Sequence, residues 1–494
     1  MNVSKDIIRF VLDNRIIEID FAKSDSGLKP TTTVLNYLRS FFGHKGVKEG
    51  CAEGDCGACT VVLGEAVDGK MQYKAVTSCL LFLPMIHGKQ LITVENLSWS
   101  ENGKQFLHPV QQALIDNYGS QCGYCTPGIV MAMFALYKNH FNPSREVIAD
   151  ALTGNLCRCT GYQSVLKAAE QACNNGGIDH FAKNEAQTIS LLTQINSGND
   201  LLEIIVAGRK YFKPGNLHQA LEIRNNYPEV LIAGGASDIA LLQTKKHVAL
   251  MEILDISSVN ELNGFHEDEQ SFYFGSGLSI ERLKWLSEDR LPALFNMLKV
   301  FGSLQIRNMA TLGGNVASAS PIGDTLPVLV ACRASVCLSS LSGNREVKIE
   351  NFIKGYRTTD IRQDEILTGV IIPRLSQNSI IKSYKISKRK DLDISTVSAC
   401  FSLKLDNNRI SDIVLAYGGV AAFTKRANKT EHFLTGKEWT RQVVEEAMKI
   451  VYYEFEPLTD ARAGADTRRI MARNLLLKFF SETNNEQSNE TTSR

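Results

Sequence analysis

Alternating apolar and polar residues open the chain. The alternation from Ile8 to Ile19 breaks at Asp13-Asn14, which predicts a β-hairpin with its turn at these two residues. Apolar residues then recur at helical spacing over 33–42, and an apolar run over 60–63 predicts a strand. Together these elements predict a small α+β domain over residues 1–95.

The next part of the chain has a helical pattern. Amphipathic spacing, with glycine and proline in between, marks four segments at 110–118, 128–137, 145–152 and 165–172. They predict an all-helical domain over 96–175. Residues 176–203 are rich in Asn, Gly, Ser and Gln and have weak periodicity, so we expect a linker with about one helical turn.

The remaining chain mixes strands and helices. Apolar β-rich runs at 230–233 and 272–274 and a helical stretch at 280–286 predict an α+β domain over 204–378. Strand patterns at 398–405 and 413–417 precede helical ones at 443–453 and 465–480, which predict another α+β domain over 379–482. The polar residues 483–494 predict a disordered tail.

Charge is balanced along this chain. Lys+Arg total 54 and Asp+Glu 53, so the net charge of +1 provides no basic surplus to attract nucleic acid or an anionic membrane. No apolar run approaches the roughly 18 residues that span a bilayer. We therefore expect a cytoplasmic chain whose partners are small molecules and protein.

Cysteines change this picture, because nine of the twelve lie at or before Cys173. Disulfides are uncommon in a large cytosolic chain, so metal binding is favoured. Cys51, Cys56 and Cys59 form C-x4-C-x2-C, followed by Cys79, which is the spacing of a plant-type 2Fe-2S site. A zinc site is the alternative, and it usually shows two C-x2-C pairs.

A second cysteine group follows in the helical region. Cys122 and Cys125 form C-x2-C, and Cys157 and Cys159 form C-x-C. Each pair lies near the start of a predicted helix, where the helix dipole favours thiolate charge. Taken alone, this group leaves zinc open as an alternative; beside the first group it indicates a second cluster.

Two glycine loops are the candidates for a nucleotide ligand. The first follows the apolar strand in Leu231 to Asp238, and the second lies at Ala310 to Asn315. Glycine loops can present backbone N–H groups to a diphosphate, although by residue type alone two tight turns are the simpler interpretation. A Rossmann-type nicotinamide site is not indicated, since no complete G-x-G-x-x-G occurs between a strand and a helix.

The cysteine motifs resemble those of a known family. The strings Glu49 to Thr60, Gln121 to Gly128 and Gly154 to Tyr162 are similar to those of the molybdenum hydroxylases, which include xanthine dehydrogenases and aldehyde oxidases. The resemblance implies a multidomain α+β chain with a β-grasp plant-type ferredoxin domain, an all-α helical 2Fe-2S domain, an α+β FAD-binding domain and an α+β C-terminal flavoprotein domain.

The same resemblance implies roles for the cysteines. Cys51, Cys56, Cys59 and Cys79 would hold the 2Fe-2S cluster nearer the flavin. Cys122, Cys125, Cys157 and Cys159 would hold the one nearer the molybdenum cofactor, which Gln121 would touch in a partner subunit.

Residues 307–315 and 320–324 resemble the flavin domain of the same family. The resemblance implies that FAD is bound by Leu231, Ile232, Ala233, Gly234, Gly235, Ala236, Ser237 and Asp238, by Thr311, Leu312, Gly313, Gly314 and Asn315, and by Phe301, Asp324, Leu367 and Lys385. No residue of this chain is expected to be catalytic.

The function implied is that of an iron-sulfur and flavin subunit of a xanthine dehydrogenase. Electrons from hypoxanthine or xanthine would pass from molybdenum through both clusters to FAD and then to NAD+. An obligate molybdenum-binding large subunit is expected, in an α2β2 assembly. The alternatives are a subunit that serves an aldehyde or another N-heterocycle, and a non-enzymatic iron-sulfur carrier.

Overall fold

A computed structural model describes residues 6–23, 27–40, 43–174, 177, 179–196, 201–376 and 378–492, with side chains as far as 484. The chain forms two compact units. The first unit comprises Met1–Asn260 and Gly302–Ala310, and the second comprises Glu261–Phe301 and Thr311–Arg494. The expected flavin domain is therefore divided between the two units.

A five-stranded sheet starts the first unit. Its strands run in the order β2 (Arg15–Asp20), β1 (Ile7–Leu12), β5 (Gln90–Ile92), β3 (Thr60–Val67) and β4 (Lys70–Thr77). Only the β1–β5 pair is parallel. Asp13 and Asn14 have φ of 52° and 58°, which suits the tight turn of the hairpin β1–β2. The order and pairing confirm the expected β-grasp fold.

Both faces of this sheet are covered. Phe10 and Val61 pack into one apolar core with α1 (Val34–Ser40), while their neighbours Val11 and Val62 pack into another. This alternation follows from the two-residue period of a strand. Helix α1 confirms the helical pattern predicted there; Phe41 and Phe42 lie outside the described residues. The 3-10 turns η1 (Leu83–Ile86) and η2 (Val94–Leu97) flank β5.

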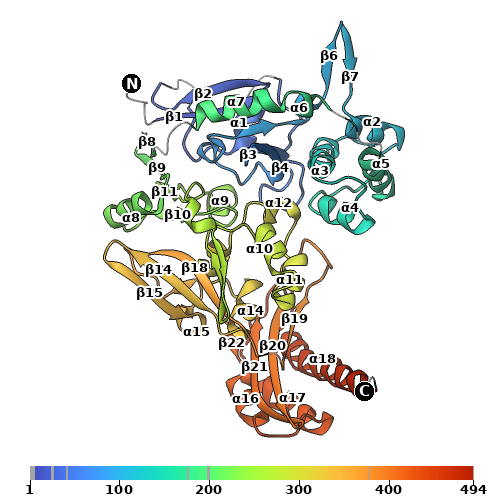
Figure 1. Ribbon diagram of the computed structural model, residues 1–494, viewed down its shortest axis with the longest axis vertical. Coiled ribbons are helices and arrows are strands. Elements are labelled where there is room, and N and C mark those ends of the chain that lie inside the picture. The colour runs from blue at the N-terminus through green and yellow to red at the C-terminus, as the bar shows by residue number, and fades with distance from the viewer. Residues whose placement is uncertain are drawn as a thin grey trace. The chain divides into compact units, whose positions relative to one another are not determined.

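Helices cover the second face of the sheet and confirm the predicted helical domain. They are α2 (Pro109–Asp116), α3 (Thr126–Asn139), α4 (Arg145–Leu152) and α5 (Gln163–Asn174). Helix α3 is buried from Gly128 to Leu136 and contacts β3 and β4. The hairpin of β6 (Trp99–Glu101) and β7 (Lys104–Phe106) projects beside α2 (Figure 1).

The stretch predicted as a linker contains more structure than expected. It forms α6 (His180–Lys183) and the eleven-residue α7 (Glu185–Ile195). Leu192 is buried in the same core as α3, and the Glu185 carboxylate accepts a hydrogen bond of 2.8 Å from the Met71 N–H. The linker prediction is wrong here, because contacts with a distant sheet stabilise a helix whose own pattern is weak.

A second, four-stranded sheet completes the first unit. Its order is β10 (Leu231–Ala233), β11 (Glu252–Asp255), β9 (Arg209–Lys213) and β8 (Leu202–Val206), with α8 (Leu217–Asn226), α9 (Ile239–Thr244) and α12 (Leu304–Arg307). Ile204, Ala233 and Ile253 belong to the same apolar core as Phe10. This continuous core explains why residues from the predicted flavin domain group with the β-grasp sheet.

The second unit begins with a five-stranded sheet. Its order is β12 (Phe265–Glu267), β13 (Ser271–Gly275), β18 (Ile366–Pro373), β14 (Ser335–Ser340) and β15 (Gly343–Lys348), preceded by η3 (Asn260–Asn263). The helices are α10 (Ile280–Ser287), α11 (Pro292–Lys299), α13 (Leu312–Ala317), α14 (Thr325–Ala331) and α15 (Ile349–Phe352). A hairpin of β16 (Ile353–Gly355) and β17 (Thr358–Thr359) precedes β18.

An antiparallel sheet and three helices end the second unit. Strands β19 (Ser379–Ile386), β20 (Val397–Asp406), β21 (Arg409–Gly418) and β22 (Lys425–Arg426) pair in sequence order. Helices α16 (Asn428–Leu434), α17 (Arg441–Glu454) and α18 (Ala465–Thr492) follow, and α17 and α18 share a core with Phe401 and Leu415. Helix α18 continues through the predicted tail as far as Thr492.

Within the described ranges, no helix combines the length and the apolar character that a membrane-spanning helix needs.

Candidate functional site

Three cysteines of the first group lie in the loop between α1 and β3, and the fourth, Cys79, follows β4. Ala52, Gly54 and Gly57 have φ of 53°, 85° and 69°, so the backbone curls around the sulfur of Cys51. The N–H groups of Glu53, Asp55 and Cys56 donate to this Sγ at 3.4, 3.3 and 3.3 Å. Such donors stabilise negative charge on sulfur, as a thiolate ligand requires.

The thiols of this group are arranged as two pairs. Cys51 interacts with Cys56 through a side-chain hydrogen bond, which lowers the pKa of Cys51 and raises that of Cys56. Cys59 interacts in the same way with Cys79, and this hydrogen bond lowers the pKa of Cys59 and raises that of Cys79. In each pair the hydrogen bond therefore favours the thiolate form of one sulfur, which is the form that binds a metal ion.

The second cysteine group has the same paired arrangement. Cys125, the residue before α3, interacts with Cys157; burial, followed by this hydrogen bond, raises the pKa of Cys125 to about 12. Cys159 interacts with Cys122, and this hydrogen bond raises the pKa of Cys159. Each pair therefore contains one sulfur from the C-x2-C motif and one from the C-x-C motif.

Polar side chains support the second group. The Thr160 hydroxyl donates to the Cys157 sulfur at 3.2 Å, and the Cys157 N–H donates to the Tyr162 hydroxyl at 2.9 Å. The Gln121 amide donates to the Cys159 carbonyl at 3.1 Å, so it joins the C-x2-C segment to the C-x-C segment. Gln121 thus has a structural role in addition to the expected contact with a partner's cofactor.

The donor sets fit two-iron clusters better than single zinc ions. A zinc site needs four ligands around one point, whereas each iron of a 2Fe-2S cluster takes two thiolates. Across the described ranges, no three Cys, His, Asp or Glu side chains converge on a single-ion position. All twelve cysteines are free thiols, so none of the eight motif cysteines is withdrawn into a disulfide.

The two groups differ in exposure. Cys59 and Cys79 are each 2% exposed, whereas Cys122 and Cys159 lie at the surface. In the first group, Cys59 and Cys79 are therefore shielded from water by the β-grasp core, while Cys51 and Cys56 are partly exposed. The second is open to whatever binds this face of the helical domain.

Lys245 was not identified from the sequence. Its Nζ donates to the Cys51 carbonyl oxygen at 3.0 Å and lies 3.3 Å from Glu53 Oε2. Lys245 follows Cys51 by 194 residues, so no local pattern signals the contact.

In the first unit, the first glycine loop joins β10 to α9. A Cβ on Gly235 would lie 1.6 Å from the Met309 carbonyl oxygen, so only glycine fits here. Ala236 has φ of 57°, and no described contact engages the N–H groups of Gly234 and Gly235. Free N–H donors in a left-handed turn suit an anionic group such as a diphosphate.

The second glycine loop, in the second unit, uses its backbone differently. Gly313 N–H donates to Ser276 O at 2.8 Å, and Gly314 N–H donates to the Thr311 hydroxyl at 3.1 Å. A Cβ on Gly313 would lie 2.6 Å from the Ser276 Cβ. These glycines therefore serve close packing and helix capping of α13, and their N–H groups are already engaged.

Asp324 and Lys385, expected at the flavin, form a buried pair within the second unit. Lys385 Nζ lies 2.8 Å from Asp324 Oδ2 and donates to the Val300 carbonyl at 2.9 Å, directly before Phe301. Ser395 donates to Asp324 Oδ1 at 2.5 Å. The lysine thus connects β19 to the segment that carries Phe301, while Leu367 is buried in β18.

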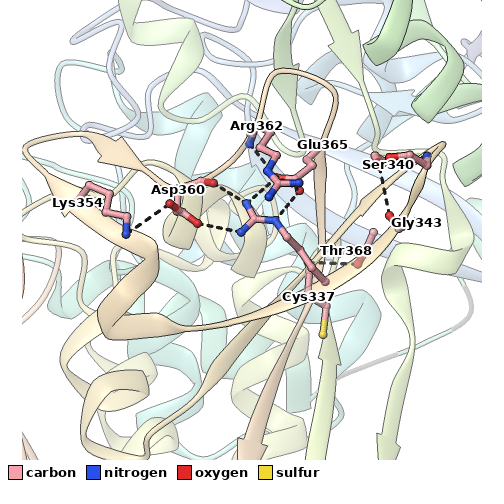
Figure 2. Close-up of polar contacts among 10 residues, drawn as sticks. Cys337, Ser340, Gly343, Lys354, Asp360, Arg362, Glu365 and Thr368 are labelled. Carbon is pink, nitrogen blue, oxygen red and sulfur yellow. Dashed lines mark hydrogen bonds and ion pairs between the residues drawn. The ribbon is translucent and has the colours of Figure 1, made fainter.

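An ion network holds the start of β18. Figure 2 shows Asp360, Arg362 and Glu365 close together, with Lys354 beside Asp360. The Arg345 guanidinium joins Asp360 to Glu365. Arg345 binds both Glu365 oxygens, at 2.6 and 2.8 Å, and Asp360 Oδ2 at 2.9 Å. Burial opposes ionisation of Glu365, but the Arg345 hydrogen bonds hold its pKa below the usual value. The network fixes Glu365, which lies two positions before Leu367.

Family models match the chain in series. Residues 26–83 match the 2Fe-2S iron-sulfur cluster binding domain, and residues 93–170 match the [2Fe-2S] binding domain. Residues 206–375 match the FAD binding domain in molybdopterin dehydrogenase, and residues 382–483 match the CO dehydrogenase flavoprotein C-terminal domain. The eight motif cysteines lie within the first two matches.

Curated relatives support the same assignment. Xanthine dehydrogenase of Blastobotrys adeninivorans is 32% identical over 92% of this chain and 39% of its own length. Xanthine dehydrogenase 1 of Arabidopsis thaliana is 31% identical over 91% of this chain and 38% of its own. The chain therefore spans about two fifths of the length of these relatives.

A solved structure supports the fold. Carbon monoxide dehydrogenase from Hydrogenophaga pseudoflava, lacking the Mo-pyranopterin moiety of the molybdenum cofactor, matches with a TM-score of 0.53 and 23% identity, over 55% of this chain and 96% of that one. Two 2Fe-2S domains, a flavin domain and its C-terminal companion, in this order, show that the chain belongs to the molybdenum hydroxylase family.

Proposed function

We propose that this chain is the electron-transfer part of a xanthine dehydrogenase. The observation that carries the proposal is the paired arrangement of eight cysteine thiols within the two matched 2Fe-2S domains, in one chain with a flavin domain. The names of its curated relatives support the choice of xanthine dehydrogenase within the family.

The eight cysteines are proposed as the iron ligands. Cys51, Cys56, Cys59 and Cys79 would hold one 2Fe-2S cluster, and Cys122, Cys125, Cys157 and Cys159 the other. N–H donors to the Cys51 sulfur, and Thr160 beside the Cys157 sulfur, would offset the negative charge of the ligands. When bound, the clusters pass single electrons and FAD accepts two, which links one-electron to two-electron chemistry.

FAD is proposed to bind the loop 231–238 together with residues 301, 311–315, 324, 367 and 385. Free N–H groups at Gly234 and Gly235 support a diphosphate contact at the first loop. In the second loop, the contact would use side chains such as Thr311 or Asn315, because the glycine N–H groups are occupied. The ion pair of Lys385 with Asp324 would fix both side chains beside the ligand.

Molybdenum, the purine substrate and NAD+ belong to the wider proposal. We propose that a large subunit holds the molybdenum cofactor in an α2β2 assembly, and the match of residues 206–375 to the FAD binding domain in molybdopterin dehydrogenase supports a molybdenum partner site. Exposed Cys122 and Cys159, with Tyr118 and Tyr124 exposed nearby in the sequence, support docking of that subunit on the helical domain. The final electron acceptor would be NAD+.

The test is native purification followed by metal analysis and a xanthine/NAD+ assay. We expect four irons and one FAD per chain, with xanthine-dependent formation of NADH. In Cys157→Ser, NADH should still reduce the flavin, but turnover driven by xanthine should stop. Cys337→Ser, outside both groups, is the matched control and should keep turnover.

Two results would contradict the proposal. Zinc without iron or labile sulfide would refute the cluster assignment. Full xanthine turnover in Cys157→Ser would refute the role of the second cysteine group.

A further inference from the structure

The two cysteine groups are directly joined inside the first unit. The Leu156 N–H, one residue before Cys157, donates to the carbonyl oxygen of Cys56 at 3.0 Å. A ligand residue of one group is therefore connected to a ligand residue of the other through one hydrogen bond and one peptide link. The Tyr124 hydroxyl adds a second connection by donating to the Glu49 carbonyl.

A buried amide holds this connection in place. Asn155 is 3% exposed, and its Nδ2 donates to the Gly57 carbonyl at 3.0 Å and to the Thr60 hydroxyl at 3.2 Å. Gly57 directly follows Cys56, and Thr60, the first residue of β3, directly follows Cys59. Asn155 therefore fixes the segment before Cys157 against the first cysteine loop.

Gln305 braces Asn155 from the other side. Its Nε2 donates to Asn155 Oδ1 at 2.8 Å, and its side chain is completely buried. Gln305 belongs to α12, which lies beside β4 and α4 (Figure 1). Neighbouring residues anchor this helix: Arg307 pairs with Asp150 at 2.7 Å, and the Asn308 amide donates to the Ala75 carbonyl at 2.9 Å.

Glycines allow the two loops to approach this closely. A Cβ on Gly57 would lie 2.2 Å from the Gly154 carbonyl oxygen, and one on Gly128 would lie 2.1 Å from the Gly57 carbonyl oxygen. A Cβ on Gly154 would lie 2.0 Å from Gln305 Oε1. At Gly57 and Gly128 the obstructing atoms are backbone carbonyls, so no side chain larger than hydrogen fits and backbone meets backbone without an intervening layer. At Gly154 the obstructing atom belongs to the Gln305 side chain, which packs directly against the Gly154 backbone.

We propose that Asn155, braced by Gln305, is a positioning residue that sets the electronic coupling between the two iron-sulfur clusters, with the contact Cys56 C=O···H–N Leu156 as the electron path. The inference rests on the proposed function. Electron tunnelling falls steeply with distance, and bonded links conduct better than gaps, so a fixed hydrogen bond between ligand-bearing segments favours fast transfer. With both clusters bound, a single electron would pass from one to the other, with no bond broken and no proton moved.

The experiment uses the full chain with its clusters, in wild type and Asn155→Ala. Both clusters are reduced, and electron paramagnetic resonance measures the signal of each cluster and the magnetic splitting between them. A light-triggered one-electron reduction then measures the rate of transfer between clusters. In Asn155→Ala we expect four irons and both signals, a reduced splitting, and transfer slower by roughly tenfold or more, as for other residues that orient metal ligands.

Asn139→Ala is the matched control. The Asn139 amide also joins a helix of the helical domain to the β-grasp sheet, by donating to the Tyr73 carbonyl at 2.7 Å, but it contacts neither cysteine loop. Its splitting and transfer rate should equal those of wild type. If Asn155→Ala loses iron, Gln305→Met tests the proposal instead, because it keeps Asn155 and removes only the hydrogen bond from Gln305 to Asn155 Oδ1. A reduced splitting and slower transfer are again expected.

The outcomes separate the two proposals. Intact clusters with unchanged splitting and unchanged rate, in Asn155→Ala or in the deciding variant Gln305→Met, would overturn the role of Asn155 and leave the proposed function standing. Wild-type protein without iron would overturn the proposed function itself.

Discussion

At the scale of single residues, Lys245 places a positive charge beside the first cysteine group. Its ammonium is hydrogen-bonded to the Cys51 carbonyl and lies next to Glu53. Positive charge near a cluster favours its reduced form, because reduction adds negative charge. Lys245→Met should therefore lower the reduction potential of this cluster by roughly a few tens of millivolts, since the charge is partly exposed and screened.

A redox titration followed by electron paramagnetic resonance measures this change. The adjacent, exposed Lys246→Met provides the control and should leave the potential near that of wild type. An unchanged or higher potential in Lys245→Met would count against this electrostatic role.

Gly235 leads to a prediction about flavin. A Cβ there would lie 1.6 Å from the Met309 carbonyl, so Gly235→Ala must displace the loop that offers its free N–H groups. We expect purified Gly235→Ala to contain iron but little FAD, measured by absorbance after denaturation. Gly355→Ala, where the nearest atom would be 4.0 Å away, should keep its flavin. Full FAD content in Gly235→Ala would contradict the assignment of this loop.

The sequence predicts candidate ligand residues only where they form a motif of closely spaced positions. The cysteine spacings identified both thiol groups and their separation into two sets. Asn155 and Gln305 are 150 residues apart, and Lys245 is 194 residues from Cys51, so their contacts depend on the fold. The sequence also leaves undetermined which thiol pairs with which, since Cys125 interacts with Cys157 rather than with Cys122.

At the scale of elements, the Arg345 network stabilises the entry to β18. The Glu365 side chain is 4% exposed and depends on Arg345 for compensation of its charge. Arg345→Met should lower the free energy of unfolding by about 2 kcal/mol, as expected for a charged hydrogen-bonded pair that is partly exposed. Arg333→Met, which removes an exposed pair with Asp412, should cost no more than about 0.5 kcal/mol.

The effect of Arg345→Met should also depend on pH. The pKa of Glu365 is lowered in the folded chain from an ordinary value of 4.5. Its stabilising contribution is therefore complete well above that value and disappears as the pH falls through the lower, folded pKa. Denaturant unfolding at neutral pH and in acid should show the difference between wild type and Arg345→Met shrinking in acid. A constant difference would argue against the ion pair as its cause.

Elements with strong local signals were predicted correctly. The Asp13-Asn14 turn indicated the hairpin β1–β2, and amphipathic spacing indicated α2 to α5. Helix α7 was missed because its stability comes from packing Leu192 against a distant sheet. The second glycine loop shows a related limit: its glycine pair suggested ligand contacts, whereas packing on Ser276 explains Gly313.

At the scale of the whole molecule, iron should stabilise the first unit selectively. Metal bound only by the folded state adds its binding free energy to folding. Chelation under reducing conditions should therefore increase amide hydrogen exchange at residues 50–59, 122–125 and 154–160. Strands β20 and β21, in the second unit, serve as the internal control and should keep their protection. Uniform loss of protection across both units would contradict this prediction.

The discontinuous first unit has a consequence for how the protein is made. Residues 302–310 belong to it, yet they leave the ribosome after residues 261–301 of the second unit. Gln305 and Arg307, both fully buried there, are thus among the last parts of that unit to be synthesised. A nascent chain of 260 residues lacks residues 302–310, which pack against the segment that joins the two cysteine groups. The contact between Gln305 and Asn155 can therefore form only after translation has passed residue 310.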